Sequence, residues 1–364
     1  MERVGCRRRR RAFRAGWNRY SRRDMDGLGG QHRDAHHPGH DGGPSRAPGD
    51  AALSRPWGRS HARRPEETAP APGCHIRDRP GRSATTLRGT AASMTVLDAP
   101  GAQLYFEVHG QGPLMVMIPG AGGAADSFRM VAEHLAADYT IVLYDRRGFS
   151  RSRLDGPQDY SHRLNTDADD VRRLIEHVGG GPATVFGASS GAIVALELQT
   201  RHPEVVHALV PFEPPAVLQL PDGDSWVKFF HQVYDLYKHA GTGPAMQRFR
   251  AQTFPHSDQQ VMNAVPRNEA NSIYWFEHEL RQYPAVQLDL NSLSLHAERI
   301  LLAVGREARG YPAHDVNVVL ARKFGRNTVE LPGGHVGAVS HPAEFAQELT
   351  TALNPGSTNR HRPA

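Results

Sequence analysis

Residues 183–195 have the sequence ATVFGASSGAIVA, which predicts a short apolar strand, a tight turn and then a helix. The turn, GASSG at 187–191, fits the G-x-S-x-G pattern of a nucleophile elbow, in which a serine sits on a strained turn between strand and helix. A side chain at either glycine would crowd such a turn. We therefore expect Ser189 to lift its hydroxyl clear of the sheet, and the amide of Ser190 to face the group that the serine attacks.

Charge is unevenly spread over the 364 residues. Residues 1–93, the leader, contain 20 Arg, no Lys and nine acidic residues, a balance of +11, and subtracting this from the chain's +5 leaves −6 for the rest. A mildly acidic body argues against a nucleic-acid groove, which needs clustered basic residues. Cys6 and Cys74 both lie in the leader, so the body has no disulfide, thiolate metal site or cysteine nucleophile. No apolar run approaches the ~20 residues that a membrane span requires. We expect a cytoplasmic protein.

The leader is rich in Arg, Gly, Pro and His and has almost no apolar periodicity, which predicts disorder. The arginines at 7–11 would suit a nucleic acid or a membrane surface. The SRR at 21–23 resembles a twin-arginine signal, but no apolar segment follows it, which argues against export. Well-patterned sequence follows Met94 at once, so we expect an over-extended start site with Met94 as the true start. A disordered tail without specific function is the alternative.

Strand patterns alternate with helix patterns along the body. Strands are predicted at 104–109, 114–118, 140–144, 183–186, 207–212, 299–304 and 328–331, and helices at 127–137, 162–178, 314–324 and 342–353, besides the helix after the elbow. This alternation implies a mostly parallel, doubly wound α/β sheet with helices on both faces. Ligands of such sheets bind beyond the carboxyl ends of the strands. We expect one such domain over 94–354, followed by a flexible tail at 355–364.

Residues 216–298 interrupt the alternation and contain eleven aromatic side chains at helical spacing. Most of these rings must pack in the insertion's own core. An insertion between the strands at 207–212 and 299–304 would nevertheless lie over the strand ends. We therefore expect a helical lid, with some of its rings lining a mostly apolar pocket for a small-molecule substrate.

A serine hydroxyl is a poor nucleophile at neutral pH, and it needs a general base, an acid that orients this base, and donors for the oxyanion. The best candidate base is His335, because it follows the last predicted strand on a glycine-rich loop. His341 precedes a proline and fits a helix start instead. The candidate oxyanion donors are the amides of Ser190 and of Ala121 or Gly122, in an early glycine loop.

The acid is open between two glutamates. Glu307 follows the strand pattern at 299–304 and Glu213 follows that at 207–212, and either strand end can deliver a carboxylate to the histidine. We favour Glu307. Asp315, inside a predicted helix, is a third option. The glutamate that is not used would be a rim charge or a salt-bridge partner.

Four motifs occur in the order that is typical of the α/β-hydrolase superfamily, which the chain resembles over about residues 95–354. They are PGAG at 119–122, DRRGFSRS at 145–152, GASSG at 187–191 and PGGH at 332–335. The resemblance implies a central eight-stranded, mostly parallel sheet with a lid. It also implies a serine nucleophile at Ser189 and a base at His335.

The chain departs from the family pattern in two places. Pro119-Gly120 stands where His-Gly is common in the oxyanion loop, and the usual aspartate after the strand at 299–304 is a glutamate. The family's Asp-Arg-x-Gly turn is usually architectural, so we expect no catalytic role for Asp145 or Arg146.

The resemblance also limits which reactions the protein can catalyse. Haloalkane dehalogenases and epoxide hydrolases use an aspartate nucleophile, and Ser189 argues against those activities. Hydrolysis of a small ester, lactone opening, C–C bond hydrolysis and cofactor-free perhydrolysis remain open. We expect a hydrolase that forms an acyl-enzyme on Ser189 and uses no cofactor or metal.

Two rivals come from other classes of protein. The GAGGAA at 120–125 fits the G-x-G-x-x-A pattern of dinucleotide binding, with Asp145 suitably placed for a ribose contact, but this reading leaves Ser189 and His335 unexplained. The second rival is a non-catalytic small-molecule binding protein on the same fold.

Overall fold

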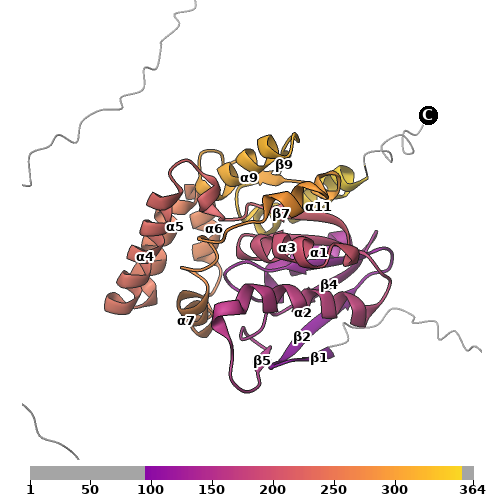
Figure 1. Cartoon of the computed structure of the whole chain (residues 1–364), viewed down its shortest axis with the longest axis horizontal. Helices are drawn as coiled ribbons and strands as arrows, with labels where there is room; N and C mark the ends of the chain where they lie inside the picture. The colour runs from indigo at the N-terminus through magenta and orange to yellow at the C-terminus, as the bar shows by residue number, and fades with distance from the viewer. Residues whose placement is uncertain (1–94, 355–364) are drawn as a thin grey trace, which may run out of the picture. The chain divides into compact units, whose positions relative to one another are not determined.

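The computed structural model describes residues 95–354, whose helices and strands are drawn in Figure 1. The expectations about the leader (disorder, a true start at Met94) and about a flexible tail at 355–364 lie outside the described residues. No helix between residues 95 and 354 is long and apolar enough to cross a membrane.

A nine-stranded sheet runs through the described part of the chain. Eight strands follow the order β1-β2-β4-β3-β6-β7-β8-β9, and the short β5 pairs with β2 off this path. The pairs from β4 through β3 to β9 are parallel, whereas β2 pairs antiparallel with β1, β4 and β5. The strands are β1 Thr95–Ala99, β2 Ala102–His109, β3 Leu114–Ile118, β4 Thr140–Tyr144, β5 Arg153–Leu154, β6 Ala183–Ala188, β7 Val206–Phe212, β8 Ala303–Gly305 and β9 Val329–Leu331. The expectation of a mostly parallel sheet is therefore confirmed.

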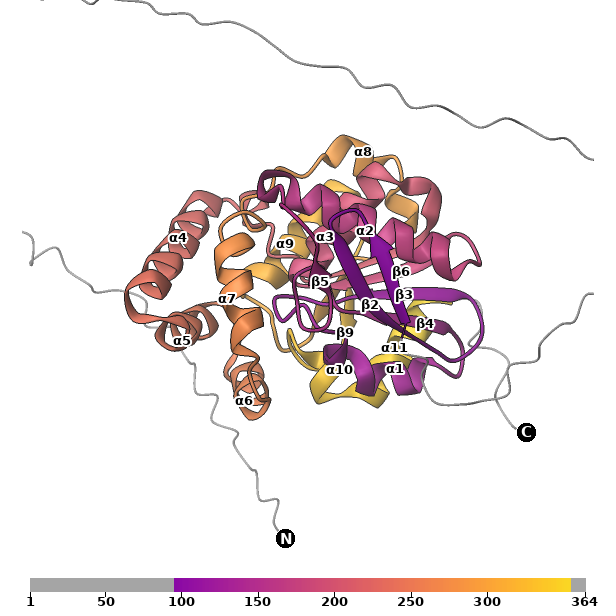
Figure 2. The ribbon, with the colours of Figure 1, turned by 90° about the horizontal axis from the view of Figure 1, so that it is seen from below.

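Helices cover both faces of the sheet, as Figure 2 shows for α1 and α11 on one side and α2 and α3 on the other. The reason is visible in β3, whose five residues are all buried: Leu114, Val116 and Ile118 join one core and Met115 and Met117 the other. The helices outside the insertion are α1 Arg129–Leu135, α2 Arg163–Val178, α3 Ser190–Arg201, α9 Pro312–Lys323, α10 Gly337–Ser340 and α11 Pro342–Leu353. A strand with two apolar faces needs such a double cover.

Element boundaries differ from the sequence-based expectation in a few places. The helix expected at 127–137 is a 3-10 turn, Ala125–Phe128, followed by α1. The strand expected at 299–304 is shorter, because a 3-10 turn ends at Arg299 and only a single bridge at Ile300 precedes β8. The strands β1 and β5 were not predicted. β1 is half-exposed and β5 has only two residues, so neither has a strong apolar pattern.

The insertion at 216–298 is helical. Its helices are α4 Gly223–Ala240, α5 Thr242–Thr253, α6 His256–Ala264, α7 Glu269–His278 and α8 Leu290–Ser294. We call α4 to α7 the lid, since they lie together beside the sheet in Figure 1, whereas α8 packs on α3. The lid has an apolar core of its own that includes Phe230, Trp275 and Phe276. Most of the insertion's aromatic residues thus pack within the insertion.

Candidate active site

The elbow at Ser189 joins β6 to α3. Ser189 has φ 55° and ψ −123°, a backbone conformation that residues other than glycine rarely adopt. Its N–H donates to the carbonyl oxygen of Phe212, the last residue of β7, at 2.9 Å. A Cβ at Gly187 would lie 2.3 Å from the carbonyl oxygen of Gly191, and one at Gly191 would lie 2.2 Å from that of Ile118. The backbone passes too close at both positions for any side chain, so this turn requires both glycines.

His335 and Glu213 meet beside the elbow. The imidazole Nδ1 of His335 lies 2.6 Å from Oε2 of Glu213, and both side chains are buried. The other carboxylate oxygen, Oε1, accepts the N–H of Gly305 at 2.8 Å. With a donor on each oxygen, the carboxylate has a defined orientation. A hydrogen on Nδ1 satisfies the contact and leaves Nε2 as the basic nitrogen of the imidazole.

The backbone explains why Glu213 makes this contact. Glu213 directly follows β7 and has φ 49°, so the chain turns sharply there and the carboxylate lies against the end of β8. The adjacent loops are also close, because a Cβ at Gly305 would lie 2.4 Å from the carbonyl oxygen of Gly334, the residue before His335. The end of β7 therefore lies within one side chain's reach of the histidine loop.

Glu307, the candidate that we favoured as the acid, does not contact His335 in this way. It is exposed, and its Oε2 accepts the hydroxyl hydrogen of Ser257 at 2.8 Å. Asp315 lies in the first turn of α9, where its Oδ1 lies 2.8 Å from Nδ1 of His314. The contact expected of Glu307 is made by Glu213 instead. The reason is that β8 is short and the chain beyond it carries residue 307 to the rim.

The loop with the candidate oxyanion donors lies against the elbow. A Cβ at Gly120 would lie 3.0 Å from the Cβ of Ser189, so the loop backbone passes directly beside the candidate nucleophile. Ala121 and Gly122 follow in this loop. Ser190 is the first residue of α3, where N–H groups have no partner within the helix. The structure thus brings all three candidate amides to the same end of the sheet as Ser189.

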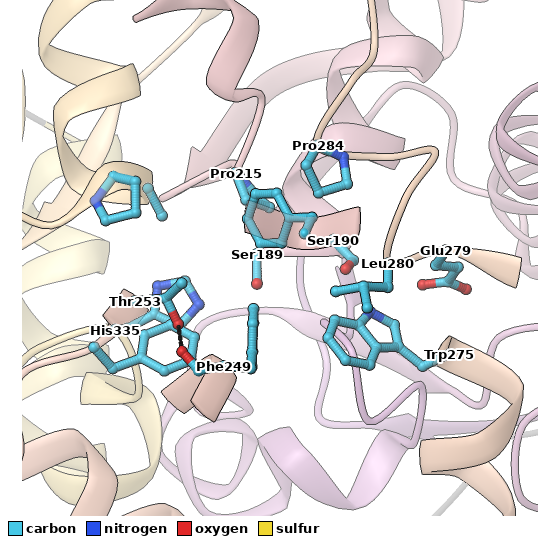
Figure 3. Close-up of a pocket in the computed structure, with 14 residues that line it drawn as sticks. Ser189, Ser190, Pro215, Phe249, Thr253, Trp275, Glu279, Leu280, Pro284 and His335 are labelled. Atoms are coloured by element: carbon cyan, nitrogen blue, oxygen red, sulfur yellow. Dashed lines mark hydrogen bonds between the residues drawn. The ribbon is translucent and has the colours of Figure 1, made fainter. Parts of the chain in front are cut away.

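A pocket opens at the elbow, between the strand ends and the lid. Figure 3 shows the hydroxyl of Ser189 directed into this pocket, which His335 also lines. Most of the lining is apolar: Pro215, Phe230, Phe249, Phe254, Trp275, Leu280, Pro284, Pro312 and Ala313. The hydroxyl of the lining residue Thr253 donates to the carbonyl oxygen of Phe249 at 2.7 Å. Of the eleven aromatic residues in the insertion, four line the pocket, which accords with the expected apolar site.

Glu279, which also lines the pocket, belongs to a buried ion-pair network. Arg146 donates to both carboxylate oxygens of Glu279, at 3.0 and 2.7 Å, and Arg163 donates to one of them at 2.9 Å. Arg146 also donates to the carbonyl oxygen of Gly120 at 2.9 Å and to Asp167 at 3.2 Å. Burial lowers the pKa of Arg146, but the charges of Glu279 and Asp167 outweigh this effect and hold it above its usual value. Arg146 therefore connects the loop beside Ser189 to the insertion.

Asp145 holds the turn after β4. Its carboxylate is fully buried, accepts the N–H of Ala125 at 2.8 Å and pairs with Arg151 at 2.6 Å. A ribose contact, which the dinucleotide reading needs, is not available to a side chain with no exposed surface. Among residues 95–354, no group of three or more His, Cys, Asp or Glu is placed to hold a metal ion.

One carboxylate at the site was missed by the sequence analysis. Asp258, in the lid helix α6, accepts the backbone N–H of His335 at 2.7 Å and that of Val336 at 3.2 Å. Burial raises the pKa of Asp258, and the attraction of His335 and the two backbone amides offsets only part of this rise. No motif could have identified it, because a single aspartate among polar residues in a helix has no distinguishing spacing.

Comparisons with known proteins agree on the family. A model described as the alpha/beta hydrolase family matches residues 115–348. The chain is 36% identical over 261 residues to the uncharacterized hydrolase YraK of Bacillus subtilis (strain 168), a match that covers 71% of this chain and 94% of that protein.

Two solved structures share the fold. A thermophilic esterase from Thermogutta terrifontis has a TM-score of 0.57 and 18% identity, covering 73% of this chain and 99% of that one. The enol-lactonase from Burkholderia xenovorans LB400 also has a TM-score of 0.57, with 17% identity, covering 71% of this chain and 100% of that one. At this level of identity the similarity concerns the fold alone.

Proposed function

Since the chain belongs to the α/β-hydrolase family and is a hydrolase, we propose that it cleaves a small, largely apolar ester, lactone or similar carbonyl substrate through Ser189, His335 and Glu213. The observation that carries this proposal is the 2.6 Å contact between His335 Nδ1 and Glu213 Oε2, made at a pocket that Ser189 and His335 both line. A hydroxyl, an imidazole and a buried carboxylate in this order form a catalytic triad, the arrangement that activates a serine.

Each residue has a defined part in the proposed reaction. Glu213 holds the Nδ1 hydrogen of His335, so that Nε2 can take the proton of Ser189 as its Oγ attacks the carbonyl carbon. The amides of Ser190 and of Ala121 or Gly122 stabilise the oxyanion that develops. His335 then protonates the leaving alcohol. In the second half, His335 takes a proton from water as the water oxygen attacks the acyl carbon. The bond between that carbon and Oγ of Ser189 then breaks, the acid leaves, and His335 returns the proton to Oγ.

The pocket supports an apolar substrate. The space in front of the elbow is surrounded by the rings of Phe230, Phe249, Phe254 and Trp275. Burial of apolar substrate surface against such rings is favourable by about 25 cal/mol for each Å² removed from water. Glu279 is the charged exception, and its carboxylate is neutralised by two arginines. A charged acyl group would have no unpaired partner among these side chains.

Perhydrolysis and C–C bond hydrolysis would use the same three residues and are distinguished only by the substrate. A non-catalytic binding protein and a dinucleotide-dependent oxidoreductase are disfavoured by membership of a hydrolase family.

Covalent labelling tests the proposal. A fluorophosphonate probe should label the wild-type protein on Ser189, as read by mass spectrometry of the modified peptide, and should label neither Ser189→Ala nor His335→Ala. Ser161→Ala, which changes an exposed serine elsewhere, is the matched control and should be labelled like wild type. A panel of p-nitrophenyl esters of increasing acyl length, extended to simple lactones, would define the substrate class. A folded wild-type protein that neither reacts with the probe nor turns over any member of the panel would contradict the proposal.

A further inference from the structure

The lid helix α6 contacts the loop that carries His335 through one carboxylate. Oδ2 of Asp258 accepts the N–H of His335 at 2.7 Å, and Oδ1 accepts the N–H of Val336 at 3.2 Å. Only 2% of Asp258 is exposed, so these hydrogen bonds are shielded from water. A carboxylate in the first turn of a helix also suits the helix dipole. Here, however, its oxygens bond another segment of the chain.

The histidine loop is shaped to receive this carboxylate. A Cβ at Gly334 would lie 2.3 Å from Oδ2 of Asp258, so a side chain there would displace the aspartate. The loop has glycine at positions 333, 334 and 337, and glycine leaves a backbone more conformational freedom than any other residue. A backbone of this composition is held in one conformation by its contacts with neighbouring segments, and the Asp258 carboxylate is one of them.

Two neighbours of Asp258 also contact the body of the protein, one through a buried ring and the other through a solvent-exposed hydrogen bond. The ring of Phe254 packs on the imidazole of His335, with 4.6 Å between the ring centroids. The hydroxyl of Ser257 donates to Glu307 at 2.8 Å. Residues 254–258 therefore contact the loops after β8 and β9 together. The bond between Ser257 and Glu307 is exposed to solvent, so its loss should change little and Ser257 can serve as a control.

The negative charges of the carboxylates around His335 also favour this arrangement. The described carboxylates that face His335 are Glu213, on its Nδ1, and Asp258, on its backbone N–H, and both are buried. Glu307 lies on the adjacent loop, where its own N–H donates to the carbonyl oxygen of Gly333. A protonated imidazole is thus stabilised by a second negative charge that comes from the lid rather than from the sheet.

We propose that Asp258 is a positioning residue for the general base: it holds the backbone of His335 so that the imidazole stays aligned with Glu213 and Ser189. Because Asp258 belongs to the lid, the base is aligned only while α6 is docked on the histidine loop. This inference rests on the proposed function. It adds that the docking of the lid helix α6 aligns the catalytic base. Small displacements of a catalytic group are enough to lower the rate by about 100-fold.

Asp258→Asn and Asp258→Ala test this role, with Ser257→Ala as the matched control on the same helix turn. Asp258→Ala should lower kcat by about 10- to 100-fold with little change in KM, because the substrate pocket is kept while the base is misaligned. Asp258→Asn retains one acceptor oxygen of the same size and should recover part of the loss. Ser257→Ala should stay close to wild type. The acidic limb of the kcat/KM profile should move to lower pH in both Asp258 variants, since a carboxylate that stabilises the imidazolium is gone.

Hydrogen–deuterium exchange gives a readout that does not depend on turnover. Peptides that contain the amides of His335 and Val336 should exchange faster in Asp258→Asn than in wild type. In Ser257→Ala they should exchange at the wild-type rate. An unchanged exchange rate, or an unchanged kcat with an unmoved pH profile, would overturn the inference, and Asp258→Asn decides the matter if the alanine variant does not fold. A failure of the proposed function would show differently, as wild-type protein that the fluorophosphonate probe does not label.

Discussion

Oε2 of Glu213 lies 2.6 Å from Nδ1 of His335, although 122 positions separate the two residues in sequence. The parallel sheet explains the meeting, because β7, β8 and β9 are adjacent and their carboxyl ends lie at one edge. Glu213 directly follows β7, Gly305 ends β8, and His335 follows β9, so the carboxylate spans β8 and reaches the imidazole.

Glu213→Gln should lower kcat by about 10²- to 10⁴-fold, because the amide no longer stabilises the imidazolium and can favour the wrong tautomer of His335. Glu307→Gln should leave kcat close to wild type, since Glu307 is exposed and bonds Ser257. Steady-state kinetics on one p-nitrophenyl ester compares the two directly. Equal losses in both variants, or a larger loss at Glu307, would contradict the assignment of the acid.

Gly191→Ala should destabilise the protein by about 1–3 kcal/mol or more, because its Cβ would lie 2.2 Å from the carbonyl oxygen of Ile118. Gly243→Ala is the matched control in another helix, α5, where nothing lies within 4 Å of an added Cβ. It should be neutral or stabilise by up to ~1 kcal/mol. Urea unfolding measures both. A Gly191→Ala protein as stable as wild type would mean that the elbow does not approach β3 so closely.

Glu279→Gln should lower the free energy of unfolding by about 3–5 kcal/mol, because it leaves Arg146 and Arg163 buried with only Asp167 to balance them. Glu176→Gln removes an exposed pair with Arg172 and should cost less than ~0.5 kcal/mol. Chemical denaturation of the two variants at the same pH makes the comparison. Similar small losses would show that the buried network does not depend on Glu279.

Trp275→Phe should shift the preferred acyl length of ester substrates toward longer chains, because Trp275 lines the pocket and the smaller ring leaves space. Phe276→Leu changes the next residue of α7, which is buried in the lid core without lining the pocket, and should keep the wild-type preference. The measurement is the ratio of kcat/KM between a long and a short p-nitrophenyl ester. An identical shift in both variants would indicate a general loosening of the lid rather than a change in the pocket.

Local pattern was enough to predict the architecture and the residues at its turns. The alternation of apolar strands with amphipathic helices indicated a mostly parallel sheet, since each period is imposed by the backbone of its own segment. The elbow was recognisable because Gly187 and Gly191 stand where neighbouring backbone leaves no room for a side chain. His335 was predicted as the base from its place after the last strand, and this place depends only on the order of elements along the chain.

The partners of these residues could not be read from the sequence, because they depend on how far each strand extends and where each loop turns. Glu213 and Glu307 both follow strands, and the positive φ at Glu213 together with the short β8 brings the first to His335 and the second to the rim. Asp258 reaches His335 across 77 positions of sequence, from a helix whose docking no local pattern describes. The spacing of the glycines around Ser189 was thus readable from the sequence, whereas the carboxylates around His335 come from the packing of distant segments.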